Sequence, residues 1–539
     1  MLNILPDKDN FIEAAKRGII SPVYAQLPFK PPHEIYNTLE SPYSFLLESA
    51  KGPEKIARYS FAGIEPFLIF KVKDGVVEIE VRSQESVGAT LNGDPFREVR
   101  SQNLSADRQD STFNPQPSTF ISHPSQNPLK ILKELLMCCK IESPPDLPPF
   151  TCGAVGLFSY DFVHYFEHLP KTALDDLKIP DAHFMFFDTV IAFDHKDKKI
   201  FIVSCPKTEK AIQDSRYKIQ DSRITYENYY DRAYKKINDL HKKIEIASSR
   251  NIGTRNDKRR SSQNPIKIHH EMGKEKYMNI VKKAKEYIKA GDIFQANLSQ
   301  RVSADIGDIT PWQIYLQLKE INPSPFAGYL NMGDYHIVSS SPERLLRVQG
   351  NAVETRPIAG TRPRGANAGG DRKMRAELLL NEKERAEHLM LIDLERNDLG
   401  RISDYGSVLV DEFMATEDYS HVIHIVSNVS GTIAKGKDCF DAIRAAFPGG
   451  TITGVPKVRC MEIIDELEPV ARGPYTGSFG YIGFNETMDL NIIIRTFVIK
   501  NNTAYVQAGA GIVADSDPEK EYYESLKKAE ALIKTLERM

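Results

Sequence analysis

Short runs of β-branched and aromatic residues, separated by turn residues, constrain the fold of this chain more than any other feature. The run FLIFKVKDGVVEIEV at 67–81 places Asp-Gly between two alternating halves, and 188–205 repeats the pattern around Asp-Lys. Such runs are typical of antiparallel β-hairpins. Runs at 424–434 and 491–513 predict further strands among helical segments. We therefore predict an α+β fold of mostly antiparallel sheets packed with helices.

Composition limits what the chain can be. Its 539 residues are 41% hydrophobic and 27% charged, enough for two to four domain-sized units. The net charge of −3 gives no basic field for nucleic acid, so we expect no nucleic-acid partner. Six cysteines without metal-ligand spacing indicate reduced thiols. No apolar run reaches the length of a membrane span, so we expect a cytoplasmic protein without a membrane partner.

Composition also divides the chain. Residues 1–206 form an N-terminal β-rich region, and about 101–127 is Ser/Gln/Asn/Pro-rich, which is typical of a disordered insertion. Residues 207–265 become charged and helical in pattern and end in a basic linker. Residues 266–539 form the remaining region, which holds most of the candidate site residues.

Two Glu-x-x-Glu pairs mark predicted helix starts. Asn381 is a suitable N-cap for the pair Glu384 and Glu387, and the second pair is Glu521 and Glu524. Spacing of three residues puts both carboxylates of a pair on one helix face. Taken alone, such a pair is more often a solvated helix start stabilised by the helix dipole.

The second pair begins with Asp517 as N-cap and Pro518 at the first helical position. If the two helix faces meet, four carboxylates converge, and they need protons or a cation between them. Oxygen ligands without Cys or His suit Mg²⁺, which binds through a few carboxylates and an anionic substrate. We therefore expect Mg²⁺ as the cofactor.

Four residues could bind an anionic ligand. Gly509 and Gly511 expose backbone N–H groups, although Gly-x-Gly is more often a turn or bulge. Arg495, in a predicted apolar strand, suits a carboxylate. The Tyr475 hydroxyl among glycines is a donor, although packing explains it equally well.

Two histidines, His421 and His424, differ in strand parity, so one of them can line a site while the other is packed or exposed. The segment FPGGTITGVPK has Val455 and Pro456 where a phosphate loop requires Lys and Ser/Thr, which excludes a nucleotide site of that kind.

Six segments resemble, in order and spacing, those of the chorismate-utilising enzyme family. The resemblance covers residues 266–539, and the N-terminal segments 41–63 and 153–167 resemble component I of anthranilate synthase and of aminodeoxychorismate synthase. It implies the two-subdomain architecture of anthranilate synthase component I. The six segments are PIAGTRPRG (357–365), KERAEHLMLIDLERNDLGR (383–401), SHVIHIVSNVSG (420–431), PGGTITGVPKVRCMEII (448–464), RGPYTGSFGYIGF (472–484) and QAGAGIVADSDPEKEYYE (507–524).

The resemblance implies a role for each candidate residue. Glu387 and Glu524 would hold Mg²⁺, with Glu384 and Glu521 behind or beside them, and the ion would anchor the ring carboxylate of chorismate. The enolpyruvyl carboxylate would be met by Tyr475 and Arg495. Backbone donors would line the pocket at Gly360, Thr361, Gly509 and Gly511.

The catalytic group implied by the resemblance contains Glu343, His424, Thr361 and Gln295. Glu343 matches the general acid, and His424 matches the histidine that assists pyruvate elimination. Isochorismate and salicylate synthases have a general-base Lys at the position of Gln295, so ammonia rather than water is the expected nucleophile. Aminodeoxychorismate synthases usually have a nucleophilic Lys at the position of Ala359, and its absence favours anthranilate as the product.

Several segments favour the other branch. FQANLSQR (294–301), NPSPFAGYL (322–330) and DLNIIIRT (489–496) resemble aminodeoxychorismate synthases more closely. The alternative product is therefore 4-amino-4-deoxychorismate, on the route to folate. A remote alternative is a catalytically silent regulatory paralogue.

Partners follow from the same resemblance. The chain has no Gly-flanked nucleophilic Cys of a glutaminase, so we expect a glutamine amidotransferase on a separate chain. LLES (46–49) and NPSPF (322–326) resemble the segments of the tryptophan feedback pocket. That pocket would include Ser49, Pro325, Phe326 and Ala327.

Overall fold

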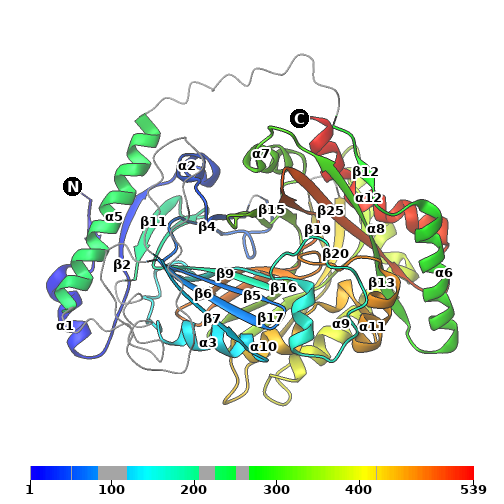
Figure 1. Ribbon diagram of the computed structural model, residues 1–539, viewed down its shortest axis with the longest axis horizontal. Helices are drawn as coiled ribbons and strands as arrows, with labels where there is room; N and C mark the ends of the chain where they lie inside the picture. The colour runs from blue at the N-terminus through cyan, green and yellow to red at the C-terminus, as the bar shows by residue number, and fades with distance from the viewer. Residues whose placement is uncertain (1, 50, 83–117, 206–224, 250–265, 420–421) are drawn as a thin grey trace.

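Two antiparallel sheets form the centre of the molecule (Figure 1), and the predicted α+β class is confirmed. The computed structural model describes residues 2–49, 51–82, 118–205, 225–249, 266–419 and 422–539. Every pair of neighbouring strands in the two sheets is antiparallel.

Sheet A has 13 strands among the described residues. In spatial order they are β1 (Ile4–Leu5), β2 (Val23–Pro28), β11 (Lys199–Ser204), β10 (Thr189–Asp194), β4 (Tyr59–Gly63), β3 (Ser44–Glu48), β14 (Phe326–Asn331), β15 (Tyr335–Ser341), β24 (Thr496–Lys500), β25 (Thr503–Ile512), β13 (Gln295–Asp305) and β12 (His269–His270), with β21 (Gly454–Val455) beside β13.

Sheet B has 12 strands among the described residues. Their order is β18 (Ile358–Pro363), β20 (Val422–Thr432), β17 (Ala352–Arg356), β16 (Arg344–Gln349), β23 (Met488–Asn491), β22 (Ser478–Gly483), β8 (Gly153–Phe158), β9 (Ala182–Phe187), β5 (Leu68–Lys73), β6 (Val76–Arg82) and β7 (Ser118–Pro124), with β19 (Leu409–Asp418) beside β20.

Both sheets cross the boundary that composition predicted between residues 1–206 and 266–539. In sheet A, β3 pairs with β14, and Leu47 lies opposite Gly328. In sheet B, β8 pairs with β22, and Gly156 lies opposite Gly480. The two regions therefore share their sheets, and each contributes roughly half of the strands of each sheet.

The helices cover the outer faces of the sheets (Figure 1). They are α1 (Lys8–Lys16), α2 (Pro32–Leu39), α3 (Pro128–Met137), α5 (Tyr226–Ser249), α6 (Lys274–Ala290), α7 (Pro311–Ile321), α8 (Ala368–Leu380), α9 (Glu382–Gly400), α10 (Cys439–Ala446), α11 (Lys457–Leu467) and α12 (Pro518–Glu537), with short 3₁₀ helices at Tyr160–Tyr165 and Gly450–Ile452.

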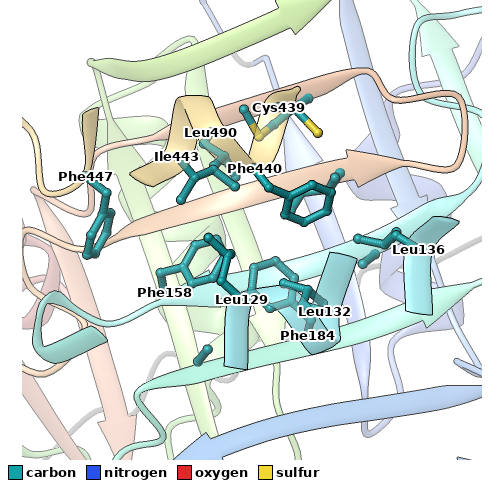
Figure 2. Packing of buried hydrophobic residues seen from close by; sticks show 14 of the residues in the cluster. Leu129, Leu132, Leu136, Phe158, Phe184, Cys439, Phe440, Ile443, Phe447 and Leu490 are labelled. Atoms are coloured by element: carbon teal, nitrogen blue, oxygen red, sulfur yellow. The ribbon is translucent and has the colours of Figure 1, made fainter. Parts of the chain in front are cut away.

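Three large hydrophobic clusters show how the layers pack. One lies between the sheets and joins Phe61 of sheet A to Phe479 of sheet B. A second packs helices α1, α2, α5, α7 and α12 on sheet A. In the third, residues of α3 and α10 meet sheet B, as Figure 2 shows for Leu132, Phe440 and Phe158. The molecule is thus a helix–sheet–sheet–helix sandwich, and each of the three clusters fills the space between two neighbouring layers.

Local sequence signals account for several elements. Asp74 and Gly75 both have positive φ (48° and 78°) in the turn between β5 and β6, as an Asp-Gly hairpin requires. The Asn381 side chain accepts a hydrogen bond from the Glu384 amide (3.0 Å) at the start of α9. Asp517 does the same for the Lys520 amide (2.9 Å) at the start of α12. Both predicted helix starts are confirmed.

Two predictions about structure need correction. The predicted insertion extended to residue 127, but β7 occupies Ser118–Pro124 and pairs with β6, because Thr119, Phe120 and Ile121 are residues that favour strands. Residues 101–117 lie outside the described residues, as does the predicted basic linker at 250–265. Arg495 is not in a strand: β23 ends at Asn491, and Arg495 has a φ of 50°, which interrupts the extended backbone before β24.

None of the described helices combines the length and the apolarity that crossing a bilayer needs. All six cysteines lie in the described residues, and no disulfide joins any two of them.

We expect no side chain larger than hydrogen to fit at Gly156, where β8 lies between β9 and β22. A Cβ at Gly156 would lie 2.0 Å from the His183 carbonyl oxygen, so Gly156→Ala must move backbone. We expect it to lower the free energy of unfolding by about 1–3 kcal/mol, measured by urea denaturation. Gly400→Ala is the control, because no atom lies within 4 Å of its Cβ position. Equal stability of the two variants would contradict this packing.

Candidate active site

Strands β13 and β25 form one wall of the candidate site. Gln295 is buried at the start of β13, and its Nε2 donates a long hydrogen bond (3.4 Å) to Oε1 of Glu387 on α9. A Cβ at Gly511 would lie 2.4 Å from the same Nε2. A Cβ at Gly509 would lie 3.0 Å from the Tyr475 hydroxyl oxygen. The two glycines of β25 are therefore required for the close approach of these side chains.

Strands β18 and β20 form a second wall. Thr361 lies opposite His424 in the ladder, and its hydroxyl is 3.0 Å from His424 Nδ1. The Gly360 carbonyl oxygen is 3.1 Å from the same nitrogen. Gly360 has a φ of 63°, and a Cβ there would lie 2.8 Å from Oε2 of Glu384. This wall therefore lies directly against the first acidic pair.

These contacts define the state of His424. The Gly360 carbonyl can only accept a hydrogen bond, so His424 Nδ1 carries the proton and Nε2 keeps its lone pair. Burial, reinforced by the positive charge of Arg495, lowers the pKa of His424 to about 4, although the hydrogen bond with Gly360 opposes this change. The imidazole is therefore neutral near pH 7 and can accept a proton. His421, the other candidate, lies outside the described residues.

Arg495 is the most informative side chain of the site. Burial lowers the pKa of its guanidinium, which has neither a hydrogen bond nor an ion pair with any described residue. Arg495 is partly exposed, and a partly buried cation without a protein partner is suited to an anionic ligand. The Tyr475 hydroxyl remains a donor, because burial raises its pKa.

Glu343 lies between β15 and β16 and is 5% exposed. Burial raises the pKa of its carboxyl to about 7, although contacts with the Thr451 hydroxyl and the Ile358 amide oppose this rise. Its Oε1 has no hydrogen-bond partner within the described residues. A carboxyl that holds its proton near neutral pH can act as a general acid.

The two acidic pairs approach each other across α9 and α12. Burial raises the pKa of Glu387, and the charges of Glu384 and Glu524 raise it further, whereas Lys528 lowers it. Burial also raises the pKa of Glu521, and the charge of Glu524 raises it further. The repulsion between Glu387 and Glu524 places the starts of α9 and α12 within electrostatic range of each other.

Two of the four carboxylates nevertheless form ion pairs with basic side chains. Glu384 pairs with Arg362 (2.9 Å) and Glu524 with Lys528 (3.2 Å). In the part of the chain that the structure describes, no three acidic, His or Cys side chains are close enough to form a metal site. The expectation that all four carboxylates converge is therefore too simple, because two of them turn towards basic neighbours.

A divalent cation still fits the chemistry of this corner. Among the described residues, the Glu387 carboxylate accepts a hydrogen bond only from the Gln295 amide, a weak neutral donor, so it is available for a ligand. Glu524 is half exposed and can leave Lys528 at little cost. Oxygen donors of this charge suit Mg²⁺, whose remaining positions are filled by water or substrate.

The four residues expected in a feedback pocket lie together, away from the catalytic group. Ser49, Pro325, Phe326 and Ala327 line a cavity of about 410 Å³ between the two sheets. Arg344 and Asp489, joined by an ion pair, also line it, so the cavity offers both signs of charge.

Three residues near the site were not singled out as site residues from the sequence. Asn297 follows Gln295 by two residues on the same face of β13, and its Oδ1 lacks a hydrogen-bond partner among the described residues. Thr451, whose hydroxyl contacts Glu343, follows a pair of glycines. Glu395 is buried on α9, and its pKa is raised to about 8 by burial and by Asp398. Strand and helix periodicity could have found Asn297 and Glu395.

A buried ion pair supports the site from behind. Glu468 and Arg472 are 3% and 1% exposed and form two parallel hydrogen bonds (2.8 and 3.0 Å). Arg472 also donates to the carbonyls of Asn297 (2.6 Å) and Ile452 (3.0 Å), and its guanidinium lies 5.5 Å from the Tyr475 ring centre. The pair thus fixes the positions of several site residues at once.

Comparison with known proteins gives consistent relatives. The family described as chorismate binding enzyme matches residues 96–534. Anthranilate synthase component 1 of Acetivibrio thermocellus is 41% identical over 515 residues, which are 94% of this chain and 94% of the relative. Aminodeoxychorismate synthase component 1 of Bacillus subtilis (strain 168) is 41% identical over 496 residues, 91% of each chain. Since both activities occur at the same identity, similarity alone does not choose between them.

A solved structure agrees with the fold. The crystal structure of anthranilate synthase component I from Streptococcus pneumoniae TIGR4 has a TM-score of 0.68 and 32% identity. The match covers 88% of this chain and 92% of that chain.

The burial of Glu343 predicts a measurable effect of pH on stability. The folded pKa, about 7, exceeds the ordinary pKa of a Glu carboxyl, 4.5, so the unfolded chain loses this proton first and stability falls as pH rises between the two values. Because Gln does not ionise, Glu343→Gln removes this loss of stability at higher pH. We expect the stability of the variant relative to the original chain to increase by roughly 3 kcal/mol between pH 4.5 and 8.

Urea denaturation at both pH values measures this difference. Glu537→Gln, at an exposed position of α12, is the control. A relative stability of Glu343→Gln that is the same at pH 4.5 and pH 8 would contradict a raised pKa at Glu343.

Proposed function

Since the chain belongs to the chorismate binding enzyme family and is a chorismate-utilising enzyme, we propose that it aminates chorismate and then eliminates pyruvate to give anthranilate, the first step of tryptophan biosynthesis. The observation that carries this proposal is the unpaired guanidinium of Arg495 beside a neutral histidine, together with the acidic corner around Glu387. Chorismate carries two carboxylates, and these two parts of the site can take one each.

Arg495 and Tyr475 would bind the enolpyruvyl carboxylate. The planar guanidinium favours two parallel hydrogen bonds to a carboxylate, and the Tyr475 hydroxyl adds a third. Gly509 and Gly511 leave room for the ligand beside β25, since a Cβ at either position would clash with neighbouring side chains. Gly360 and Thr361 would complete the lining of the pocket from β18.

Glu387 and Glu524 would hold Mg²⁺, with Glu384 and Glu521 beside them. The ion supplies charge for the ring carboxylate, which carboxylates alone would repel. Until then the basic partners Arg362 and Lys528 balance the charges of Glu384 and Glu524. Binding of the substrate and binding of the ion should therefore depend on each other.

Amination requires loss of the ring hydroxyl. Glu343 would protonate the hydroxyl at C4, which leaves as water, while ammonia forms a bond to C2 and the two ring double bonds shift. The ammonium group on the ring then releases one proton. Gln295 is an amide and too weak a base to activate water, which disfavours isochorismate as a product.

Pyruvate elimination would use His424. Its free Nε2 can remove the proton at C2, after which the C3–O bond breaks and the enolpyruvyl group leaves as pyruvate. Thr361 and the Gly360 carbonyl hold the ring of His424 through Nδ1. They are therefore positioned to orient the base during aromatisation.

A second candidate is amination at C4 to 4-amino-4-deoxychorismate, on the route to folate. The Bacillus subtilis relative, named aminodeoxychorismate synthase component 1, supports it at 41% identity. Ala359, buried in β18 beside Gly360, supports the first candidate because it cannot act as a nucleophile.

Two partners belong to the proposal. The relatives are named component 1, which fits a separate glutamine amidotransferase chain as the source of ammonia. The cavity lined by Ser49, Pro325, Phe326 and Ala327 would take tryptophan as a feedback ligand. Its mixed charges suit the ammonium and carboxylate groups of a free amino acid.

Product analysis tests the proposed function. The purified chain is incubated with chorismate, Mg²⁺ and ammonium chloride, and products are identified by fluorescence and mass spectrometry. We expect anthranilate and pyruvate in equal amounts, without a covalent enzyme adduct. Accumulation of 4-amino-4-deoxychorismate without pyruvate would establish the second candidate instead.

Glu343→Gln and Glu537→Gln are compared in the same assay. The first should lose at least a hundredfold in kcat, because general acid catalysis contributes about 10²–10⁴ in rate. The second should retain full activity.

A further inference from the structure

An aromatic side chain lies against the proposed base, His424. The ring centres of Tyr419 and His424 are 5.1 Å apart, and the two ring planes meet at 76°. Aromatic pairs prefer this edge-to-face arrangement, in which the positive edge of one ring meets the negative face of the other. Tyr419 is buried, so close packing limits the movement of its side chain. Its ring therefore restricts the orientations that the imidazole can adopt.

Tyr419 is itself fixed through its backbone and its hydroxyl. Its amide donates a hydrogen bond to the Val422 carbonyl (2.9 Å), and its carbonyl accepts one from Arg364 (3.2 Å). Its hydroxyl donates to Oε2 of Glu417 (3.2 Å). Burial raises the pKa of Tyr419, and the charge of Glu417 raises it further, so the hydroxyl remains a donor near neutral pH. These three hydrogen bonds hold the residue before any ligand binds.

The carboxylate that holds the Tyr419 hydroxyl belongs to a buried ion-pair network. Glu417 lies opposite His424 in the ladder between β19 and β20. Its Oε1 accepts a hydrogen bond from Arg356 (2.5 Å), and Arg356 also pairs with Glu412 (2.7 Å). Separating a buried ion pair leaves an uncompensated charge, so the network has one strongly favoured geometry. It therefore keeps the Tyr419 hydroxyl in one place.

The orientation of His424 matters because its two ring nitrogens have different tasks. Nδ1 contacts the Gly360 carbonyl and the Thr361 hydroxyl, whereas Nε2 is the proton acceptor in the proposed elimination. Contacts at one nitrogen leave the ring free to tilt about that point. A second restraint, on another part of the ring, is needed to keep Nε2 directed at the substrate, and the Tyr419 ring lies where it can supply one.

Resting on the proposed function, we propose that Tyr419 is a positioning residue for pyruvate elimination, whose ring keeps Nε2 of His424 directed at the proton on C2 of the aminated ring. Nε2 takes this proton, and the electrons of the C2–H bond form the double bond between C2 and C3 that makes the ring aromatic. The C3–O bond breaks, and the enolate of pyruvate leaves and gains a proton. Amination comes earlier and uses Glu343, so it does not need this restraint.

The fate of the aminated intermediate tests the assignment. Tyr419→Leu removes the aromatic ring, and the full chain is incubated with chorismate, Mg²⁺ and ammonium chloride. Chorismate, the aminated intermediate and pyruvate are followed separately by mass spectrometry and a coupled pyruvate assay. We expect pyruvate release to slow about tenfold, which is close to the full contribution of an aromatic pair, while the aminated intermediate accumulates. Chorismate consumption and the KM for chorismate should change by less than about twofold, because neither depends on the elimination step.

The chain supplies matched controls. Tyr419→Phe keeps the ring contact and should restore pyruvate release to within about threefold of the original rate. Tyr405→Leu makes the same chemical change at a fully exposed side chain and should alter neither rate. If Tyr419→Leu does not fold, Tyr419→Met removes the same ring with a flexible side chain that fills irregular space.

Each result decides between a positioning role and simple packing. Pyruvate release and chorismate consumption that fall together in Tyr419→Leu overturn the assignment, because a general structural defect slows both steps. Unchanged pyruvate release in Tyr419→Leu, or a Tyr419→Phe variant that is equally slow, also overturns it, and the proposed function stands in all these cases. An original chain that releases no pyruvate from chorismate and ammonium overturns the proposed function and this inference with it.

Discussion

The candidate site depends on the buried ion pair between Glu468 and Arg472. The pair joins the end of α11 to the loop that carries Tyr475, and through backbone carbonyls it also holds Asn297 and Ile452. Breaking such a pair costs about 3–5 kcal/mol, since one charge would remain buried alone. The pair therefore holds several segments, distant in sequence, in one arrangement before any ligand binds.

Around this fixed frame, several polar groups remain unsatisfied. The Arg495 guanidinium and the oxygens of Glu343, Gln295 and Asn297 lack hydrogen-bond partners among the described residues. A stable protein accepts such costs mainly at functional sites, where a ligand removes them. The same burial raises the pKa of Glu343 and lowers that of His424, so the candidate site holds both a proton donor and a proton acceptor.

Much of this was predictable from local signals. The N-caps Asn381 and Asp517 identify both acidic helix starts, and the structure confirms them, because capping is decided by a few neighbouring residues. Arg495 was predicted in a strand, but its positive φ breaks the strand there. Tertiary packing, rather than β propensity, decides the backbone conformation at this residue. The pairing of Glu468 with Arg472 appears in the sequence only as spacing of four residues, and its burial depends on strands far away in the chain.

Calorimetric titration with chorismate, in Mg²⁺ and without ammonia, tests the central claim most directly. The claim is that an unpaired guanidinium binds one carboxylate of the substrate while Mg²⁺ binds the other. We expect one chorismate per chain, an affinity at least tenfold weaker in Arg495→Met because a charged hydrogen bond contributes about 1.5–3 kcal/mol, and a comparable loss without Mg²⁺. Equal affinity of the original chain and Arg495→Met for chorismate would contradict it.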